Sequence, residues 1–228
     1  MAIYKLDKVI VSVKGNAEKF LQGLTSNTLE APRNAFLSLH GRIIATFDQV
    51  SVGDDEFLLV IAPSAWEPLR VHTERYAKLG KTTIAPTALN AYFDTKGDYI
   101  LSDWEYAIPQ NAGRIIVTDR ALASDISAEE FTLFRLQNKI PLHGVDYTDD
   151  FILNVHEHEF TSYTKGCFLG QEPVAKVHNR SKPTWVLAVR HEDELNAEEK
   201  AKMTSKAIDP KTGRIFGFLF CKNIESNT

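Results

Sequence analysis

Cysteine is scarce in this 228-residue sequence, which contains only Cys167 and Cys221. The two stand far apart and form no Cys-x-x-Cys pair. Structural zinc sites and iron–sulfur clusters typically need four ligands, so we expect this chain to hold no metal centre alone. Such sparse cysteine is also typical of proteins in a reducing compartment.

Signals for a membrane or for secretion are lacking as well. A membrane-crossing helix needs roughly 20 apolar residues in succession, and the sequence contains no such run. Residues 1–15 alternate apolar and polar side chains, which predicts a strand rather than the apolar core of a signal peptide. We therefore expect a cytoplasmic protein without a membrane partner.

An excess of basic charge is absent too. The sequence has 26 Lys and Arg against 30 Asp and Glu, a formal net charge of −4. No global positive field attracts nucleic acid, so we expect no direct nucleic-acid binding, and any anion site must be local. A hydrophobic content of 43% and a charged content of 25% are ordinary for a soluble globular protein.

The first half of the sequence predicts helices that alternate with β-rich runs. A helix is expected over 16–24 with Asn16 as its N-cap, and another over 63–79 that Gly80 closes. Between them, β-rich runs at 35–40, 41–52 and 56–62 predict a meander. Shorter strands are expected at 81–85, 89–94, 98–103 and 113–119.

The second half predicts one helix and a small β unit. Ser127 and Glu130 form a capping-box pattern, which predicts a helix that ends before Pro141. Residues 151–164 form a connector, strands are expected at 185–191 and 214–223, and the polar segment between them fits helix or loop. The predicted fold is α+β, with mixed, mostly antiparallel sheets and packed helices over 1–182 and a short β unit over 183–228.

The stretch KGCFLGQE, residues 165–172, concentrates the functional signal. A cysteine nucleophile acts as the thiolate, and Lys165 places a positive charge two residues before Cys167. Gly166 and Gly170 permit backbone angles at which a flat ligand can approach. Gln171 and Glu172 supply an amide and a carboxylate suited to the donor edge of a heterocycle. The alternative is that Cys167 is a small buried hydrophobic residue in a glycine turn.

Residues 165–172 resemble the K-G-C-[FY]-x-G-Q-E signature of the YgfZ family, folate-binding proteins related to the T protein of the glycine cleavage system. The resemblance extends to FLQGLTSN at 20–27, GRIIATFDQV at 41–50 and EPVAKVHNR at 172–180. FRLQNKIPLHGVD at 134–146 is also similar, although Lys139 stands where the family pattern has glycine. About residues 1–190 are covered.

The resemblance implies a protein that binds tetrahydrofolate or a derivative in a cleft near the centre of residues 1–182. It also implies a role in making or maintaining iron–sulfur enzymes, including some that modify tRNA, so these enzymes or their assembly machinery are the expected partners. Cys167 and Lys165 are then the functional thiol and its cation, and Gly166, Gly170, Gln171 and Glu172 contact the folate. Lys176 and Arg180 make the neighbourhood basic and suit a folate's glutamate tail or a phosphate.

Two departures from the family bear on the function. The T protein carries a catalytic aspartate on a strand where this sequence has Ala45 and Thr46, with Asp48 as the nearest acid. The third domain of longer relatives is reduced here. The alternatives are a folate-dependent aminomethyltransferase, whose reaction is one-carbon transfer, and a degenerate module that binds a ligand without catalysis.

Other residues admit a functional interpretation with less support. His156 and His158 lie on one face of an extended segment, but a third metal ligand at a defined spacing is missing, so a solvated polar connector is favoured. Trp66 and Trp104 are large enough to stack on a pterin, although such residues are more often in the core. Cys221 is expected to be a buried thiol in a strand that places Phe216, Phe218 and Phe220 on one face.

Overall fold

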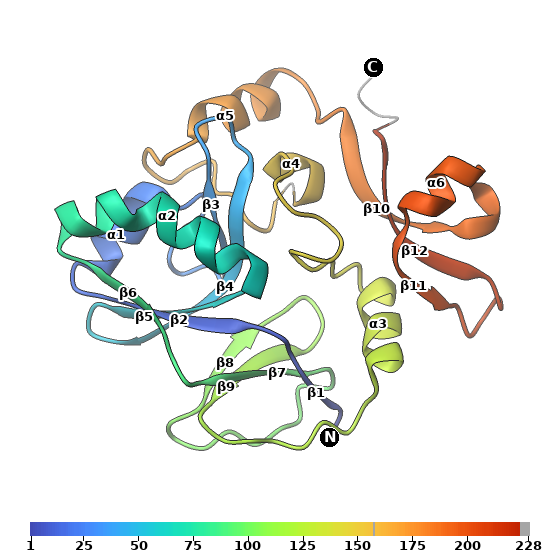
Figure 1. Ribbon diagram of the computed structural model, residues 1–228, viewed down its shortest axis with the longest axis horizontal. Coiled ribbons are helices and arrows are strands. Elements are labelled where there is room, and N and C mark those ends of the chain that lie inside the picture. Colours follow the sequence, from blue (N-terminus) through green and yellow to red (C-terminus); the bar gives the residue numbers. More distant parts are fainter. Residues whose placement is uncertain (157, 224–228) are drawn as a thin grey trace.

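A computed structural model describes residues 1–156 and 158–223 of the chain (Figure 1). Its strands form three sheets, and every pair of neighbouring strands within them is antiparallel. Helices pack beside these sheets, so the predicted α+β class is confirmed. None of the helices in the described ranges is long and apolar enough to cross a membrane.

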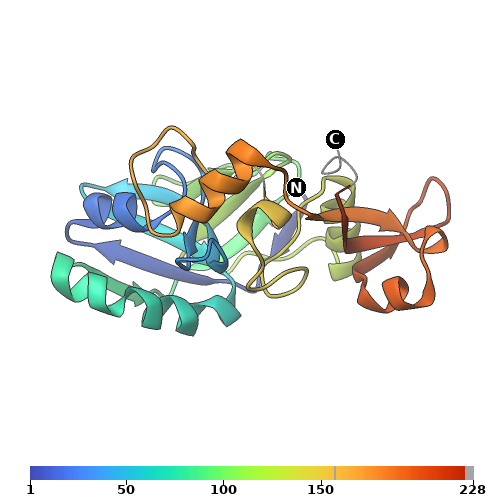
Figure 2. The same ribbon diagram turned by 90° about the horizontal axis from the view of Figure 1, so that it is seen from above.

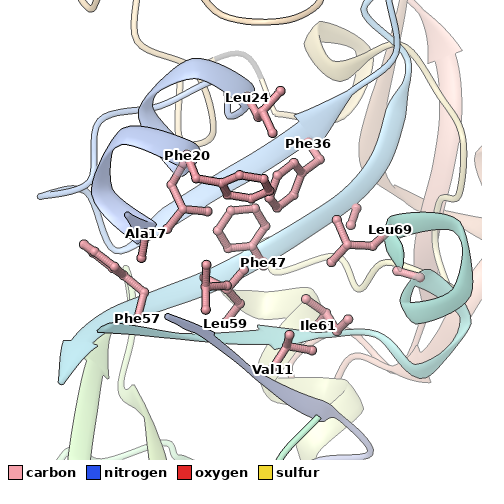
Figure 3. Close-up of a cluster of buried hydrophobic side chains, with 14 of the residues drawn as sticks. Val11, Ala17, Phe20, Leu24, Phe36, Phe47, Phe57, Leu59, Ile61 and Leu69 are labelled. Carbon is pink, nitrogen blue, oxygen red and sulfur yellow. The ribbon is translucent and has the colours of Figure 1, made fainter. Parts of the chain in front are cut away.

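The largest sheet has the strand order β3-β4-β5-β2-β6. Its strands are β2 (Val9–Lys14), β3 (Arg33–Leu37), β4 (Ile43–Gly53), β5 (Glu56–Ile61) and β6 (Thr83–Pro86). Helices α1 (Ala17–Leu24) and α2 (Pro63–Gly80) cover one face, where Phe20, Phe36 and Leu69 meet Phe47 and Leu59 (Figure 3). The predicted meander and both helices are therefore present.

Strand β5 is apolar on both sides because both faces of this sheet are covered. Leu59 and Ile61 point into the core beneath α1 and α2, whereas Leu58 and Val60 pack with residues of the second sheet. Successive side chains of a strand point to opposite faces, so a strand buried on both faces is a continuous apolar run. The run EFLLVI therefore marks the middle layer of the molecule.

The second sheet has the order β1-β7-β9-β8 and corrects two expectations. Its strands are β1 (Ile3–Lys5), β7 (Asn90–Asp94), β8 (Tyr106–Pro109) and β9 (Arg114–Thr118). Residues 1–15 form two strands in different sheets rather than one, because the chain crosses between the sheets around Leu6. The strand predicted at 98–103 is wrong: Ser102 instead donates its backbone N–H to Glu105, and β8 begins after it.

The third sheet, with the order β10-β12-β11, stands at one end of the molecule (Figure 2). It contains β10 (Trp185–His191), β11 (Thr204–Ile208) and β12 (Ile215–Lys222), with a short 3-10 helix η1 (Glu192–Glu194) and helix α6 (Ala197–Lys202) after β10. The polar segment thus forms a helix and then a strand. Phe216 and Phe218 are buried against α3 (Ala128–Gln137), which begins at the predicted Ser127–Glu130 capping box.

Two predicted helix ends differ in detail. Asn16 adopts left-handed angles at the start of α1 and makes no side-chain cap; its amide donates to the carbonyl of Gly80 instead. Helix α2 continues through Gly80, and Lys81 takes the left-handed conformation, with φ of 56°. Both departures come from one contact, in which the start of α1 closes against the end of α2.

A buried ion pair connects the third sheet to helix α3 and to the segment that follows it. Arg135 of α3 donates to Asp146 at 2.8 Å and to the hydroxyl of Ser205 at 2.7 Å. The other oxygen of Asp146 accepts hydrogen bonds from Thr204 and Ser205 of β11, at 2.7 and 2.5 Å. Both charged side chains are almost fully buried. Each therefore depends on its charged partner to replace the interactions with water that burial removes.

We expect Asp146→Ala to lower the free energy of unfolding by roughly 3–5 kcal/mol, because it leaves the Arg135 guanidinium buried without its carboxylate. Urea denaturation followed by circular dichroism measures this loss. The double variant Arg135→Met/Asp146→Leu removes both charges and should lose less than Asp146→Ala. Glu67→Ala, which breaks the exposed Glu67–Arg70 pair, is the control. Equal losses in Asp146→Ala and this control would contradict the assignment.

Candidate functional site

The largest sheet, the second sheet and the segment before the signature meet at a buried arginine, Arg33 of β3. Its guanidinium contacts the carboxylate of Glu159 and the side-chain oxygen of Gln110, which lies in the turn between β8 and β9. Gln110 also donates to Asp48 of β4 at 2.8 Å, and Asp48 lies 3.7 Å from Arg33. The first sheet, the second sheet and the segment before the signature are thereby joined by one polar cluster, which we call the junction.

Burial perturbs the charged groups of the junction. It raises the pKa of the Asp48 carboxyl, while Arg33 and the hydrogen bond from Gln110 act against that rise. Burial also lowers the pKa of Lys8, whose charge the nearby Asp48 partly supports. Perturbed ionisable groups gathered in a cavity wall are a feature of functional sites.

Tyr147 extends the junction with a hydroxyl and two histidines. Its hydroxyl lies 2.7 Å from the Thr46 hydroxyl and 3.0 Å from Nε2 of His156. The His143 ring stacks on Tyr147 at 5.3 Å, and its Nδ1 accepts the Thr46 backbone N–H. Burial lowers the pKa of His143 to about 4 and that of His156 to about 3, so both rings are neutral near pH 7.

A small cavity of about 50 Å³ lies at the junction. Its wall brings together polar side chains from four separate stretches of sequence: Lys8, Arg33, Thr46, Asp48, Gln110, His143, Tyr147, His156 and Glu159. The volume is less than two water molecules occupy in the liquid, at about 30 Å³ each. A ring-sized ligand therefore requires side chains of the junction to move.

A larger groove of about 730 Å³ lies on the outside, between α1, the end of α2 and residues 167–169. We call it the outer groove. Its wall contains Cys167, Lys19 and Lys81 together with the apolar side chains of Leu24 and Leu79. The thiol of the signature thus borders the outer groove, whereas no residue of 165–172 lines the junction cavity.

Lys165 anchors the signature loop to the first sheet. Its ammonium group donates to the carbonyls of Thr25 and Asn27, at 2.7 and 2.8 Å, and lies over the Phe168 ring at 5.4 Å. Partial burial lowers the pKa of Lys165 to about 8. These contacts give the lysine a structural role in holding the loop and leave Cys167 exposed.

The two glycines of the signature differ in what they require. Gly170 has φ of 85°, and a side-chain carbon there would lie 2.3 Å from the Ser38 carbonyl oxygen, so only glycine fits. Gly166 has open space beside it. Gly170 therefore serves a close approach of two backbone segments, the turn after β3 and the start of α5 (Gln171–Arg180).

Helix α5 was not predicted, and it carries the remaining candidate residues. Gln171 and Glu172 lie in its first turn, while Lys176 and Arg180 are exposed further along it. None of these four side chains lines the junction cavity or the outer groove. The structure thus places these four side chains outside both cavities.

The histidines and tryptophans have defined places. His156 is buried against Tyr147 and Phe160, so the expected solvated connector is wrong at this residue. Among residues 1–156 and 158–223 no group of three potential metal ligands comes together. Trp66 packs against the core beneath α2, and Trp104 is exposed. Cys221 is half-buried rather than buried, with its sulfur 3.6 Å from both the Val186 carbonyl and Arg190.

Four residues of the junction carry no site motif in the sequence: Lys8, Arg33, Gln110 and Tyr147. The available signal was a charged residue next to an apolar strand, as in LDKVIV and PRNAFL. Charged side chains are rarely buried unless they are paired, so such positions are candidates for a polar cluster. The pairing itself joins residues far apart in the chain, and sequence spacing does not reveal it.

The neutral histidines predict acid sensitivity. A histidine with a pKa of about 4 in the fold and 6.5 when unfolded contributes stability above pH 6.5 and loses it as the pH falls toward 4. We expect His143→Gln to reduce the pH dependence of the unfolding free energy in this window by up to about 1.4 kcal/mol per pH unit. Asp48 acts in the opposite sense, so the comparison is between variant and wild type.

Urea denaturation at several pH values between 4 and 7 measures this slope. His40→Gln, which changes an exposed histidine, is the matched control and should keep the wild-type slope. An unchanged slope in His143→Gln would contradict the buried neutral state of this ring.

Exposure predicts a difference between the two thiols. We expect iodoacetamide near pH 7 to alkylate Cys167 at least about tenfold faster than Cys221, because reagent access limits a half-buried thiol. Peptide mapping by mass spectrometry over a time course measures both rates. Equal rates, or faster labelling of Cys221, would contradict exposure as the factor that sets this order.

Comparisons with known proteins bear on the fold. No family model matches the sequence. The chain is 25% identical over 228 residues to an uncharacterized protein of Haemophilus influenzae, a match that covers 90% of this chain and 80% of that protein. The structure of this chain is similar to that of the glycine cleavage system aminomethyltransferase T from Bartonella henselae, with a TM-score of 0.72 and 14% identity. The match covers 97% of this chain and 78% of that one. The chain therefore has an aminomethyltransferase-like fold.

Proposed function

We propose that this chain binds a reduced folate at the junction and supports the assembly or repair of iron–sulfur enzymes, including some that modify tRNA. In this proposal residues 1–182 form the folate-binding region, residues 183–228 form a short β unit, and Cys167 is the functional thiol. The aminomethyltransferase-like fold and the resemblance of KGCFLGQE to the YgfZ signature support it.

The observation that carries the proposal is the concentration of buried polar groups at the junction. Removing a charged or hydrogen-bonding group from water costs free energy, and a packed apolar centre avoids that cost. Here Arg33, Asp48, Tyr147 and two neutral histidines share one cavity wall. A polar ligand that uses these groups gives a reason for their retention.

The chemistry of the junction suits an amino-oxo heterocycle such as the pterin of folate. Asp48 and Gln110 present a carboxylate and an amide side by side, which match adjacent donors and acceptors of the ring. Tyr147 and Thr46 add hydroxyls. Because the cavity is only about 50 Å³, binding requires the contact between Arg33 and Glu159 to open; Glu159 is its outer member, with 38% of the side chain exposed.

Aminomethyl transfer is a weaker explanation for this site. Thr46 lies in the junction wall where the resemblance places the catalytic aspartate. The nearest acid, Asp48, is already engaged by Gln110 and Arg33. An accessory role, with folate binding separated from the thiol chemistry, fits these positions better than a transferase or a module without any activity.

The outer groove is the second candidate location for the folate. Its volume of about 730 Å³ lies in the range typical of ligand pockets, and Cys167 borders it. Of the signature, Cys167, Phe168 and Leu169 line this groove. Contacts of the folate with Gly166, Gly170, Gln171 and Glu172, and of its glutamate tail with Lys176 and Arg180, would require the ligand to extend beyond the groove. Variants in the two locations distinguish these possibilities.

We expect tetrahydrofolate to bind with a dissociation constant of millimolar or tighter, and Asp48→Asn to weaken binding at least about tenfold, a loss of about 1.4 kcal/mol. Anaerobic isothermal titration calorimetry measures both affinities. The double variant Lys19→Gln/Lys81→Gln, at the outer groove, should bind like wild type. The reverse pattern would place the folate in the outer groove, and the absence of saturable binding at millimolar ligand would refute folate binding altogether.

Cys167→Ser tests the role of the thiol in two measurements, folate affinity by the same calorimetry and restoration of function in cells. We expect it to keep the wild-type folate affinity, because Cys167 is not in the junction wall. It should fail to restore the activity of an iron–sulfur tRNA-modifying enzyme in cells that lack this protein. Restoration by Cys167→Ser would remove the thiol from the proposal while leaving folate binding in place.

A further inference from the structure

Strand β10 exposes an unpaired backbone edge. Within the described chain it pairs only with β12, in a regular antiparallel register from Trp185–Lys222 to His191–Phe216. The N–H of Asn223 donates to the carbonyl of Thr184 at 2.9 Å, so alternate residues from Thr184 onward face β12. The backbone N–H and C=O groups of Leu187 and Val189 therefore point away from β12.

A groove of about 580 Å³ runs along this edge. Five successive residues, Val186–Arg190, line one side of it. Successive side chains of a strand point to opposite faces, so a groove that all five touch includes the edge of β10. Phe218 of β12 also lines it, so the groove continues onto the face that packs against α3. Lys139, Val155 and Glu159 line the opposite side, and Figure 1 shows β10 as the strand of its sheet that faces α4 (Ile152–Val155).

The groove leads to the junction. Pro141, His156 and Glu159 line both the groove and the junction cavity. A chain lying along β10 would therefore have one side chain facing the outer wall of the polar cluster. This continuity links the edge of the third sheet to the centre of the molecule.

The charges of the groove favour an acidic occupant. Among the described residues, neither Lys139 nor Arg190 takes part in an ion pair. Glu159 is the carboxylate that the described residues contribute to the wall, and Arg33 already engages it. Two cations without an acidic partner thus remain beside the exposed edge, and carboxylates of a bound chain would complement them.

The shape of the groove selects a single extended chain. Neighbouring strands lie about 4.8 Å apart, so one added strand fits beside β10, whereas stacked sheets need about 10 Å. A second copy of this protein would bring its whole sheet against the α4 side of the groove. An unpaired edge flanked by pockets for alternate side chains is the arrangement by which sheets bind peptides through strand addition.

We propose that an extended peptide segment of a partner protein adds to β10 as a fourth strand of the third sheet. Its backbone bonds to the outward N–H and C=O groups of Leu187 and Val189, its alternate apolar side chains face Leu187 and Val155, and acidic residues at its ends pair with Lys139 and Arg190. This binding is independent of folate.

Selection from a random 12-residue peptide library displayed on phage, with the full chain as bait and no folate present, tests the proposal. Enriched peptides should alternate apolar residues and carry Asp or Glu near their ends. One enriched peptide, synthesised, should slow hydrogen exchange of the Leu187 and Val189 amides at least about tenfold in NMR spectra. The amides of Val186, Ala188 and Arg190 are already bonded to β12 and should change little.

Val189→Pro is the decisive variant, because proline removes the outward N–H and is tolerated at an edge position whose N–H does not join the ladder. It should weaken the peptide at least about tenfold, whereas Val189→Ala, which trims the side chain but keeps the N–H, should stay within about threefold. If Val189→Pro does not fold, the exchange data on the wild-type chain decide alone.

Charge is tested separately by Arg190→Gln and Lys139→Gln, each of which should weaken the acidic peptide and reduce its salt dependence. Lys211→Gln, distant on the loop before β12, is the matched control. Failure to enrich alternating peptides, protection of amides elsewhere, or binding that Val189→Pro leaves intact would each overturn the proposal. Loss of folate binding with peptide binding retained would overturn only the proposed function.

Discussion

The guanidinium of Arg33 is the constraint on which the arrangement of the molecule depends. It is buried, and its partners come from the turn between β8 and β9, from β4 and from the segment before the signature. A buried arginine is tolerated only when its donors are matched, so these segments must converge on one point. The place where the sheets meet is thus also the place where polar chemistry is concentrated.

The thiol of the signature and the polar cavity of the junction lie apart in the structure, whereas the sequence suggested that residues 165–172 hold both the thiol and the ligand contacts. Lys165 is occupied by the carbonyls of Thr25 and Asn27, and Gly170 by its close contact with Ser38. These contacts hold the loop so that Cys167 is exposed at the outer groove, apart from the junction wall. A thiol outside and a polar cavity inside are consistent with a protein that binds a ligand at one place and meets another molecule elsewhere.

The third sheet adds a further surface to this arrangement. Its attachment through Arg135 and Asp146 turns one face toward α3 and brings the free edge of β10 beside α4. A three-stranded sheet leaves an edge that a fuller β unit would pair, and here that edge lies over a wall shared with the junction. The position of the Arg135–Asp146 ion pair therefore decides which edge of the third sheet remains available for binding.

Local patterns in the sequence determined the elements whose causes are local. The capping box at Ser127 and Glu130, the apolar face of α1 and the alternating phenylalanines of β12 all appear where the residues predict them. Side-chain volume, hydrogen-bonding groups and permitted backbone angles act over a few residues, so a single stretch contains enough information.

Tertiary structure alone decided the features that depend on distant partners. Residues 1–15 divide between two sheets because each half finds a different neighbour, and Lys81 rather than Gly80 takes the left-handed position after α2, next to the contact between Asn16 and the Gly80 carbonyl. The junction unites Arg33, Gln110 and Glu159, which no spacing rule connects. Burial and charge pairing are set by what surrounds a residue in space, so their energies become defined only when the whole chain has folded.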